Sequence, residues 1–229
     1  MKLIQQQKIS EQLEFIIYEN NQSSDYFMNL DIWSHSEIEY IKKLYPKRQL
    51  EYLASRFMLK QRFIINDDWP LVKNEFGKLY LTNYPIEFSL SHSDRYTGYA
   101  FGNHEVGFDL QVYQNKVLRI LQKFLNEAEL EILNQIQDSE NFLKSATLLW
   151  SAKEAIYKSF GKKGLAFKHQ ILLNCYYENK SITISSAQLI LSDKSLKYKL
   201  LYGLEASYVW AIATMDEPDS SDHDWVAVM

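Results

Sequence analysis

Three short apolar runs follow one another in the middle of the chain, and they limit its fold more than any other feature. Ile86–Ser91, Tyr96–Phe101 and Val106–Val112 each have the length and composition of a β-strand. The sequence Gly102-Asn103-His104 predicts a hairpin between the last two runs, although Asn-His is a weaker turn signal than Asn-Gly. The middle of the chain is therefore predicted to form antiparallel sheet.

Two helices are predicted before these strands. Ser34 and Glu37 form a capping-box pattern at the start of a helix that runs to Tyr45, and Pro46 ends it. A second helix is predicted from Arg48 to Phe63, where apolar residues recur at helical spacing. Two apolar runs nearer the N-terminus are predicted to be strands: Phe15–Tyr18 and Tyr26–Trp33.

The second half repeats this mixture of helices and strands. Asn126 and Glu129 form a capping-box pattern, with Asn in place of the usual Ser or Thr. A long helix is predicted from Asn141 to Phe160, and Gly161 ends it. The strands predicted after it are Ile171–Tyr177, Ile182–Ile184, Tyr198–Tyr202 and Ser207–Thr214. The predicted fold class is α+β.

The length of 229 residues fits two halves of similar size, and we place them at 1–104 and 105–215. Residues 216–229 form an acidic segment with one proline, which we expect to be a mobile tail. The formal net charge of −4 argues against a nucleic-acid-binding protein, because such proteins carry a broad basic surface.

The sequence predicts a cytoplasmic protein. A single cysteine, Cys175, has no partner for an intramolecular disulfide, which favours a reducing compartment. The first residues contain no apolar run that resembles a signal peptide, and no stretch approaches the ~18 apolar residues of a membrane span.

One strand carries two polar side chains that lie on the same face. Along Gly107–Val112, Phe108 and Leu110 point to one side of the strand while Asp109 and Gln111 point to the other. A carboxylate and an amide oxygen thus project together. The same alternation is also typical of a half-buried strand whose polar face is in water.

A second group of polar residues lies on the long helix. Trp150, Glu154 and Lys158 are spaced four residues apart and share one helix face, while Leu149 and Ile156 lie on the face expected to be core. A Glu one turn before a Lys is also an ordinary surface ion pair, worth roughly 0.2–0.5 kcal/mol. That alternative does not explain the large Trp on the same face.

A third group is Ser91-His92, at the end of a predicted strand. A single His in such a place is more often structural than functional. The sequence contains no P-loop, dinucleotide-binding, nucleophile-elbow or His-Glu-x-x-His zinc motif, so the corresponding enzyme classes have no support.

The order and spacing of the three groups resemble the Sfp-type 4′-phosphopantetheinyl transferase family, which shows Ser-His, then Gly-x-Asp-x-Glu, then Trp-x-x-Lys-Glu-Ala/Ser-x-x-Lys. The resemblance covers about residues 40–170. Four further segments are similar to family patterns: Arg48–Arg56, Phe76–Tyr80, Phe124–Glu129 and Gly161–Phe167. The chain departs from the family at Gln111, where the family usually has Glu.

The resemblance implies a pseudo-dimer of two similar α+β halves, each with antiparallel strands packed on helices, and an active site in the cleft between them. It implies an enzyme that moves 4′-phosphopantetheine from coenzyme A to a serine of an apo acyl or peptidyl carrier protein and releases 3′,5′-adenosine bisphosphate. It also implies Mg²⁺ as cofactor.

The residue roles that the resemblance implies fall into two groups. Asp109, Glu154 and Gln111 are the metal ligands it implies, and Asp109, Glu154, Lys158 and His92 are the catalytic residues, with Glu154 as acceptor of the serine proton. The residues expected to bind coenzyme A are Arg48, Arg56, Lys78, Ser91, His92, Lys153 and Lys158. An acidic carrier protein is expected beside the basic run of Lys158, Lys162 and Lys163, and the protein is expected to be a monomer.

Three hypotheses about the function remain open, and Gln111 bears on the first two. An amide retains an oxygen donor but loses a charge, so we expect an active enzyme with weaker metal binding, while a silenced paralogue remains an alternative. A second hypothesis is a module that binds coenzyme A or a carrier protein without transferring anything. A third is a structural α+β domain. Whether the carrier serves fatty acid, polyketide or nonribosomal peptide synthesis is left open.

Overall fold

A computed structural model describes residues 1–63, 71–82 and 86–216 of the chain. The predicted mobile tail, 216–229, therefore lies outside the described residues apart from Asp216. The carboxylate of Asp216 pairs with Lys199 at 3.1 Å, at the end of the last strand.

The N-terminal half contains β1 (Lys2–Ser10), β2 (Leu13–Glu19), α1 (Ser24–Met28), α2 (His35–Lys42), α3 (Pro46–Arg62), β3 (Leu71–Lys73), β4 (Leu79–Leu81), β5 (Glu87–Ser93) and β6 (Tyr96–Gly102). The C-terminal half contains β7 (Val106–Val112), a 3₁₀ turn at Val117–Ile120, α4 (Leu121–Phe124), α5 (Glu127–Leu133), α6 (Ser139–Phe160), α7 (Phe167–Gln170), β8 (Ile171–Glu178), β9 (Ser181–Ile190), β10 (Ser195–Leu204) and β11 (Tyr208–Met215).

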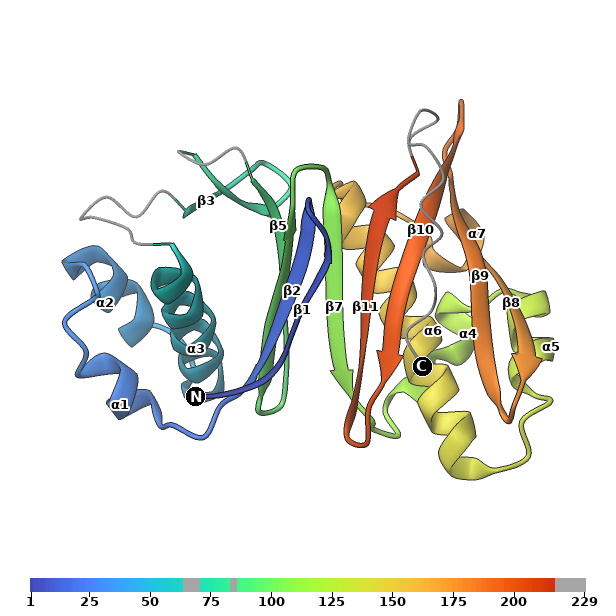
Figure 1. Ribbon diagram of the computed structural model, residues 1–229, viewed down its shortest axis with the longest axis horizontal. Helices are drawn as coiled ribbons and strands as arrows, with labels where there is room; N and C mark the ends of the chain where they lie inside the picture. The colour runs from blue at the N-terminus through green and yellow to red at the C-terminus, as the bar shows by residue number, and fades with distance from the viewer. Residues whose placement is uncertain (64–70, 83–85, 217–229) are drawn as a thin grey trace.

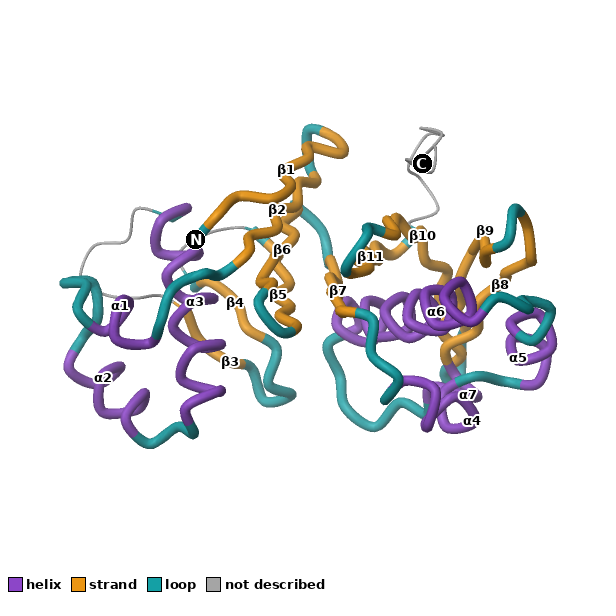
Figure 2. Tube along the Cα trace, turned by 90° about the horizontal axis from the view of Figure 1, so that it is seen from below, coloured by secondary structure: helices purple, strands orange, loops and turns teal. Residues whose placement is uncertain are grey.

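Two antiparallel sheets form the centre of the molecule. The first has the order β1-β2-β6-β5, and the second has the order β7-β11-β10-β9-β8. Helices α1 to α3 lie beyond the first sheet and α6 lies against the second (Figure 1; Figure 2). The α+β class predicted from the sequence is confirmed.

Alternation along the strands divides the core into layers. On β2, Phe15 and Ile17 pack against Phe108 of β7 and Trp210 of β11, so an apolar layer lies between the two sheets. Residues of the opposite parity, such as Ile16, face α3 instead. The central strands β2, β6, β7 and β11 are therefore largely buried, and burying a polar group between them without a hydrogen bond costs free energy.

Local signals predict several helix ends, but the prediction that Pro46 ends the first of the predicted helices is wrong: α2 ends at Lys42, and Pro46 is the first residue of α3. Ser34 and Glu37 form the expected capping box before α2, and Asn126 and Glu129 form the second one before α5. Gly161 ends α6 with a φ of 68°, a left-handed conformation that favours glycine.

Two predictions about the first half are wrong. Tyr26–Trp33 is not a strand: residues 24–28 form α1, because the Ser23 hydroxyl accepts a hydrogen bond from the Tyr26 backbone at 3.2 Å and caps a helical turn. The second error is that no strand was predicted for Lys2–Ser10, which forms β1. β1 carries no apolar pattern, because it is an edge strand whose side chains are largely exposed.

The predicted hairpin at Gly102-Asn103-His104 is also wrong. β6 pairs with β2 and β5, whereas β7 pairs with β11 in the other sheet. The chain crosses between the sheets at this turn because Phe108 and Leu110 of β7 are buried in the layer between them. The turn is therefore the covalent link between the two halves.

Candidate functional site

Gly107 allows strand β7 to lie directly against helix α6. A Cβ atom at this position would overlap the carbonyl oxygen of Ala155 and the backbone nitrogen of Ser159. Only glycine avoids this overlap, so the strand and the helix approach more closely than side chains normally permit. Asp109 lies two residues further along the same face and points toward the helix that carries Glu154.

The Asp109 carboxylate is the centre of a hydrogen-bonded cluster and is only 1% exposed. Its Oδ1 atom accepts hydrogen bonds from Lys158 Nζ at 2.7 Å and from Ser91 Oγ at 3.0 Å. Lys158 Nζ also donates to Ser91 Oγ at 3.0 Å and to the Phe108 carbonyl at 3.1 Å. The cluster thus brings together Ser91, Asp109 and Lys158, which are far apart in the chain and were predicted to act together.

Gln111 lies beside Asp109 on β7, as the strand alternation predicts. Its Nε2 atom donates a hydrogen bond to Asp109 Oδ2 at 3.1 Å. The amide therefore presents its donor, rather than its oxygen, to the carboxylate that was predicted to share a metal ion with it.

Glu154 lies on the α6 face that meets the cluster. Burial and, to a smaller extent, the negative charge of Asp109 raise the pKa of its carboxyl group to about 7, against the opposing effect of Lys158. The carboxyl group of Glu154 thus lies close enough to Asp109 and Lys158 for both charges to act on it.

The donor set fits a magnesium ion in its chemistry. Mg²⁺ binds oxygen ligands and tolerates water in several places, so two carboxylates suffice as protein ligands. A divalent cation would also remove the repulsion that raises the pKa of Glu154. Within the described residues no group of three or more His, Cys, Asp or Glu side chains is arranged around one point, so Asp109 and Glu154 would hold the ion with water.

Serine hydroxyl groups join β5 to β7 along the boundary of the two sheets. The Phe108 backbone N–H donates to Ser89 Oγ at 2.9 Å, and the Val112 N–H donates to Ser93 Oγ at 3.1 Å. Ser91 lies between these two contacts and reaches Asp109. This serine seam fixes the strand positions that place Ser91 opposite the carboxylate.

His92 points away from the seam, toward helix α3. Its Nδ1 atom lies 3.8 Å from Glu51 Oε1, and the other oxygen of Glu51 accepts a hydrogen bond from Arg48 at 2.7 Å. Burial lowers the pKa of His92, and the nearby Glu51 opposes this effect. His92 and Arg48 are therefore connected through one carboxylate.

Arg56 is brought to a different place. Its guanidinium group lies 4.6 Å from the centre of the Tyr52 ring and donates to Ser55 Oγ at 3.3 Å, and the side chain is only 7% exposed. Burial lowers its pKa. Among the described residues its hydrogen bond and its ring contact lie on its own helix, not at Asp109.

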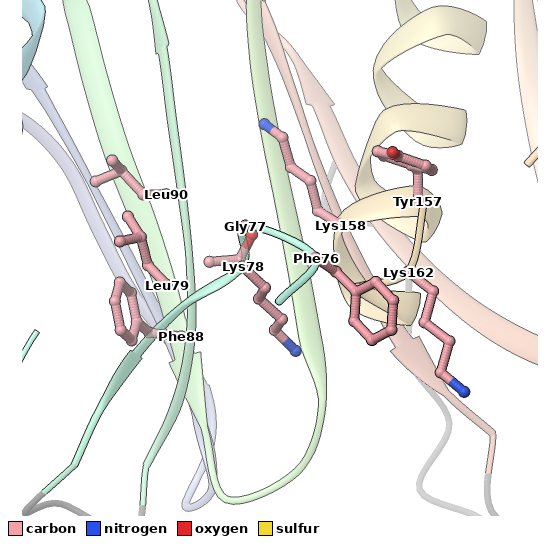
Figure 3. Close-up of a pocket in the computed structure, with 11 residues that line it drawn as sticks. Phe76, Gly77, Lys78, Leu79, Phe88, Leu90, Tyr157, Lys158 and Lys162 are labelled. Carbon is pink, nitrogen blue, oxygen red and sulfur yellow. The ribbon is translucent and has the colours of Figure 1, made fainter. Parts of the chain in front are cut away.

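A pocket of about 230 Å³ opens beside the cluster. It is lined by residues from the β3–β4 hairpin, from β5 and from the end of α6: Phe76, Gly77, Lys78, Leu79, Phe88, Ser89, Leu90, Tyr157, Lys158, Gly161 and Lys162. Figure 3 shows the apolar side chains of Leu79, Leu90 and Phe88 on one side and Tyr157 and Lys162 on the other. Lys78 pairs with Glu87 at 3.1 Å on the sheet side. The pocket thus combines apolar walls with ammonium groups.

Lys153 is not brought to this cluster. Its side chain is fully buried, and its Nζ atom donates to Glu129 at 2.7 Å and to the carbonyls of Phe124 at 2.8 Å and Phe167 at 3.2 Å. Trp150 packs against the same two phenylalanines, with ring centres 5.0 Å and 5.6 Å apart. Both residues hold neighbouring segments against α6.

Several residues at the site were not singled out from the sequence. The alternation of Ser89, Ser91 and Ser93 was visible and signals one polar face of a strand. Glu51, three residues after Arg48, had only the signal of an ordinary helical ion pair. No signal in the sequence pointed to Tyr157, because tertiary packing places this residue at the pocket.

Among the residues that the structure describes, no helix is long and apolar enough to cross a membrane.

Comparison with known proteins gives two matches. A family model described as the 4′-phosphopantetheinyl transferase superfamily matches residues 105–213, the segment that contains Asp109, Glu154 and Lys158. The 4′-phosphopantetheinyl transferase gsp of Aneurinibacillus migulanus is 30% identical over 123 residues, which cover 53% of this chain and 51% of that protein. The chain thus spans about half the length of the curated relative it matches. Both matches name the family whose motifs meet at the cluster, so residues 105–213 of this chain are similar to the 4′-phosphopantetheinyl transferase superfamily.

Proposed function

We propose that this protein is a Mg²⁺-dependent enzyme that transfers the 4′-phosphopantetheine group of coenzyme A to a serine of an apo acyl or peptidyl carrier protein. The observation that carries the proposal is the convergence of Asp109, Glu154 and Lys158 beside a pocket with several ammonium groups. The matched family and the curated relative support it.

The proposed reaction is a phosphoryl transfer. The serine oxygen of the carrier forms a bond to the β-phosphorus of coenzyme A while the bond to the bridging pyrophosphate oxygen breaks, and 3′,5′-adenosine bisphosphate leaves. In such reactions the protein mainly positions the groups and neutralises charge. Mg²⁺ held by Asp109 and Glu154 would supply charge neutralisation at the pyrophosphate.

Glu154 is the proposed acceptor of the serine proton, directly or through a water molecule. Its place on the α6 face beside Asp109 and Lys158 supports this role, because a general base must lie within reach of the proton that it takes. Lys158 forms an ion pair with Asp109 at 2.7 Å and is proposed to contact phosphate oxygens from the same helix face as Glu154.

The remaining proposed ligands surround the pocket and the seam. Lys78 contributes an ammonium group that lines the pocket, and Ser91 and His92 approach from β5. We propose Arg48 as a phosphate ligand at the rim, since its side chain is 67% exposed and guanidinium groups bind phosphate well. Arg56 is proposed to act there only through α3, because it contacts Tyr52 and Ser55.

Lys153 is removed from the proposed coenzyme A ligands. Its ammonium group is fully buried with three acceptors, so it cannot reach a ligand without breaking a buried ion pair. We propose instead that it orients the helix that carries Glu154.

The broader setting is also proposed. The basic run at Lys162 and Lys163 follows α6 and lines the approach to the pocket, which favours an acidic carrier protein. The free, buried Cys175 fits a reducing cytoplasm. We propose a monomer whose two halves, 1–104 and 105–215, form a pseudo-dimer around the cluster.

One experiment tests the function. The protein is incubated with coenzyme A, Mg²⁺ and a panel of apo carrier proteins, and intact mass reports the addition of one phosphopantetheine group. Asp109→Ala is the control and should show no transfer. Binding of coenzyme A without any mass gain would favour the alternative, a binding module, to which the Gln111–Asp109 hydrogen bond points because it occupies a metal-facing oxygen.

A further inference from the structure

Glu51 is a nearly buried carboxylate that lies between the guanidinium group of Arg48 and the imidazole ring of His92. Its side chain is 12% exposed, its Oε2 atom accepts a hydrogen bond from Arg48 at 2.7 Å, and its Oε1 atom lies 3.8 Å from His92 Nδ1. Glu51 also connects two elements of the fold, because it lies on α3 whereas His92 lies on β5. The proposed reaction has no use for this negative charge.

The carboxylate lies within the electrostatic field of the proposed phosphate site. The charges of four neighbouring groups all act on the pKa of His92: Glu51, Lys158, Arg48 and Asp109. A phosphate that approaches Arg48 and His92 therefore meets two groups that already lie beside a protein carboxylate. Like charges brought close together in a partly buried site repel each other, so the carboxylate must weaken phosphate binding there.

We infer that Glu51 is a built-in competitor of phosphate, which holds Arg48 and His92 in the free protein and weakens the binding of both coenzyme A and 3′,5′-adenosine bisphosphate. The inference rests on the proposed function. Binding substrate and transition state more tightly by the same amount does not raise the turnover rate, and tight binding of a phosphorylated product delays its release. Glu51 limits this excess affinity.

The test is the dissociation constant for 3′,5′-adenosine bisphosphate, measured by calorimetry on the full chain. Glu51→Gln keeps the size of the side chain and removes its charge, and binding should become tighter by roughly three- to tenfold, as expected for one charge at short range in a partly hydrated site. A residue that merely supported the fold would not give this result, because damage to the fold weakens binding.

Glu39→Gln is the matched control. It makes the same charge change on α2, where Glu39 is exposed and pairs with Lys42 at 3.5 Å, and it should leave the dissociation constant unchanged. Glu51→Ala is a second neutral variant, and thermal unfolding shows whether each variant is folded. Folded Glu51→Ala should also bind 3′,5′-adenosine bisphosphate more tightly than the wild type does.

Two results would overturn the inference while leaving the proposed function intact. One is an unchanged or weaker affinity in folded Glu51→Gln, and the other is an equal gain in Glu39→Gln, which would show an effect of net charge alone. If wild-type protein binds neither the bisphosphate nor coenzyme A, the proposed function itself is wrong.

Discussion

Replacing Glu154 by Gln tests the electrostatics of the cluster without relying on catalysis. Burial and Asp109 raise the pKa of this carboxyl group from 4.5 to about 7 in the folded protein. The difference of about 2.5 units corresponds to about 3.4 kcal/mol, at about 1.4 kcal/mol for each unit. Because Glu154 is partly exposed, solvent reduces this value, and we expect about 2 kcal/mol.

The sign follows from proton binding. Between pH 4.5 and about 7 the folded state binds more protons at Glu154 than the unfolded state does, so the free energy of unfolding decreases as the pH rises through this window. Above about pH 7 the contribution levels off. Gln does not ionise, so the Glu154→Gln variant lacks this decrease, while all other titrating groups contribute to both proteins.

The assay is urea unfolding of both proteins in a metal chelator at pH values from 5 to 8. The wild type should lose about 2 kcal/mol more than the variant between these limits. Adding Mg²⁺ at pH 8 should stabilise the wild type and leave the variant nearly unchanged, because metal binding needs the charged carboxylate. Parallel pH profiles for the two proteins would refute the raised pKa of Glu154 in the folded protein.

Four further substitutions test other parts of the structure. Gln111→Glu places a third carboxylate beside Asp109 and should lower the Mg²⁺ concentration for half-maximal transfer, whereas an unshifted Mg²⁺ dependence would place residue 111 outside the reach of the metal. Gly107→Ala should destabilise the protein by about 3 kcal/mol or more in thermal unfolding, because the Cβ atom overlaps the α6 backbone. Gly164→Ala, which has open space and only a φ of 90° to accommodate, should cost about 1 kcal/mol. Lys153→Met leaves the Glu129 charge buried and unpaired, and should cost about 3–5 kcal/mol of stability; unchanged stability with weaker coenzyme A binding would return Lys153 to the ligand site.

The elements that could be predicted are those with strong local signals. The two capping boxes and the left-handed Gly161 involve residues within one turn of each other, so the sequence alone predicts them. α1 was missed because the cap at Ser23 outweighs an apolar run that also suits a strand. β1 was missed because a strand exposed at a sheet edge needs no apolar pattern.

The site was predictable to the extent that periodicity decides which side chains share a face. Asp109 and Gln111 on β7, and Glu154 and Lys158 on α6, follow from periods of two and about 3.6 residues. The burial of Lys153 was not predictable, because its partner Glu129 lies in a separate helix and is placed by tertiary packing. The pairing of β7 with the distant β11, in place of β6, has the same origin.

The apolar layer between the two sheets has a consequence for any shortened version of this chain. Phe108, Leu110 and Trp210 belong to the segment that matches the family, yet they are covered by Phe15 and Ile17 of the first half. A fragment that began at residue 105 would present this surface to water and would associate with other copies or precipitate. Residues 1–104 therefore cover this apolar surface and also supply Ser91. Removing them is expected to cost the protein its solubility and its site.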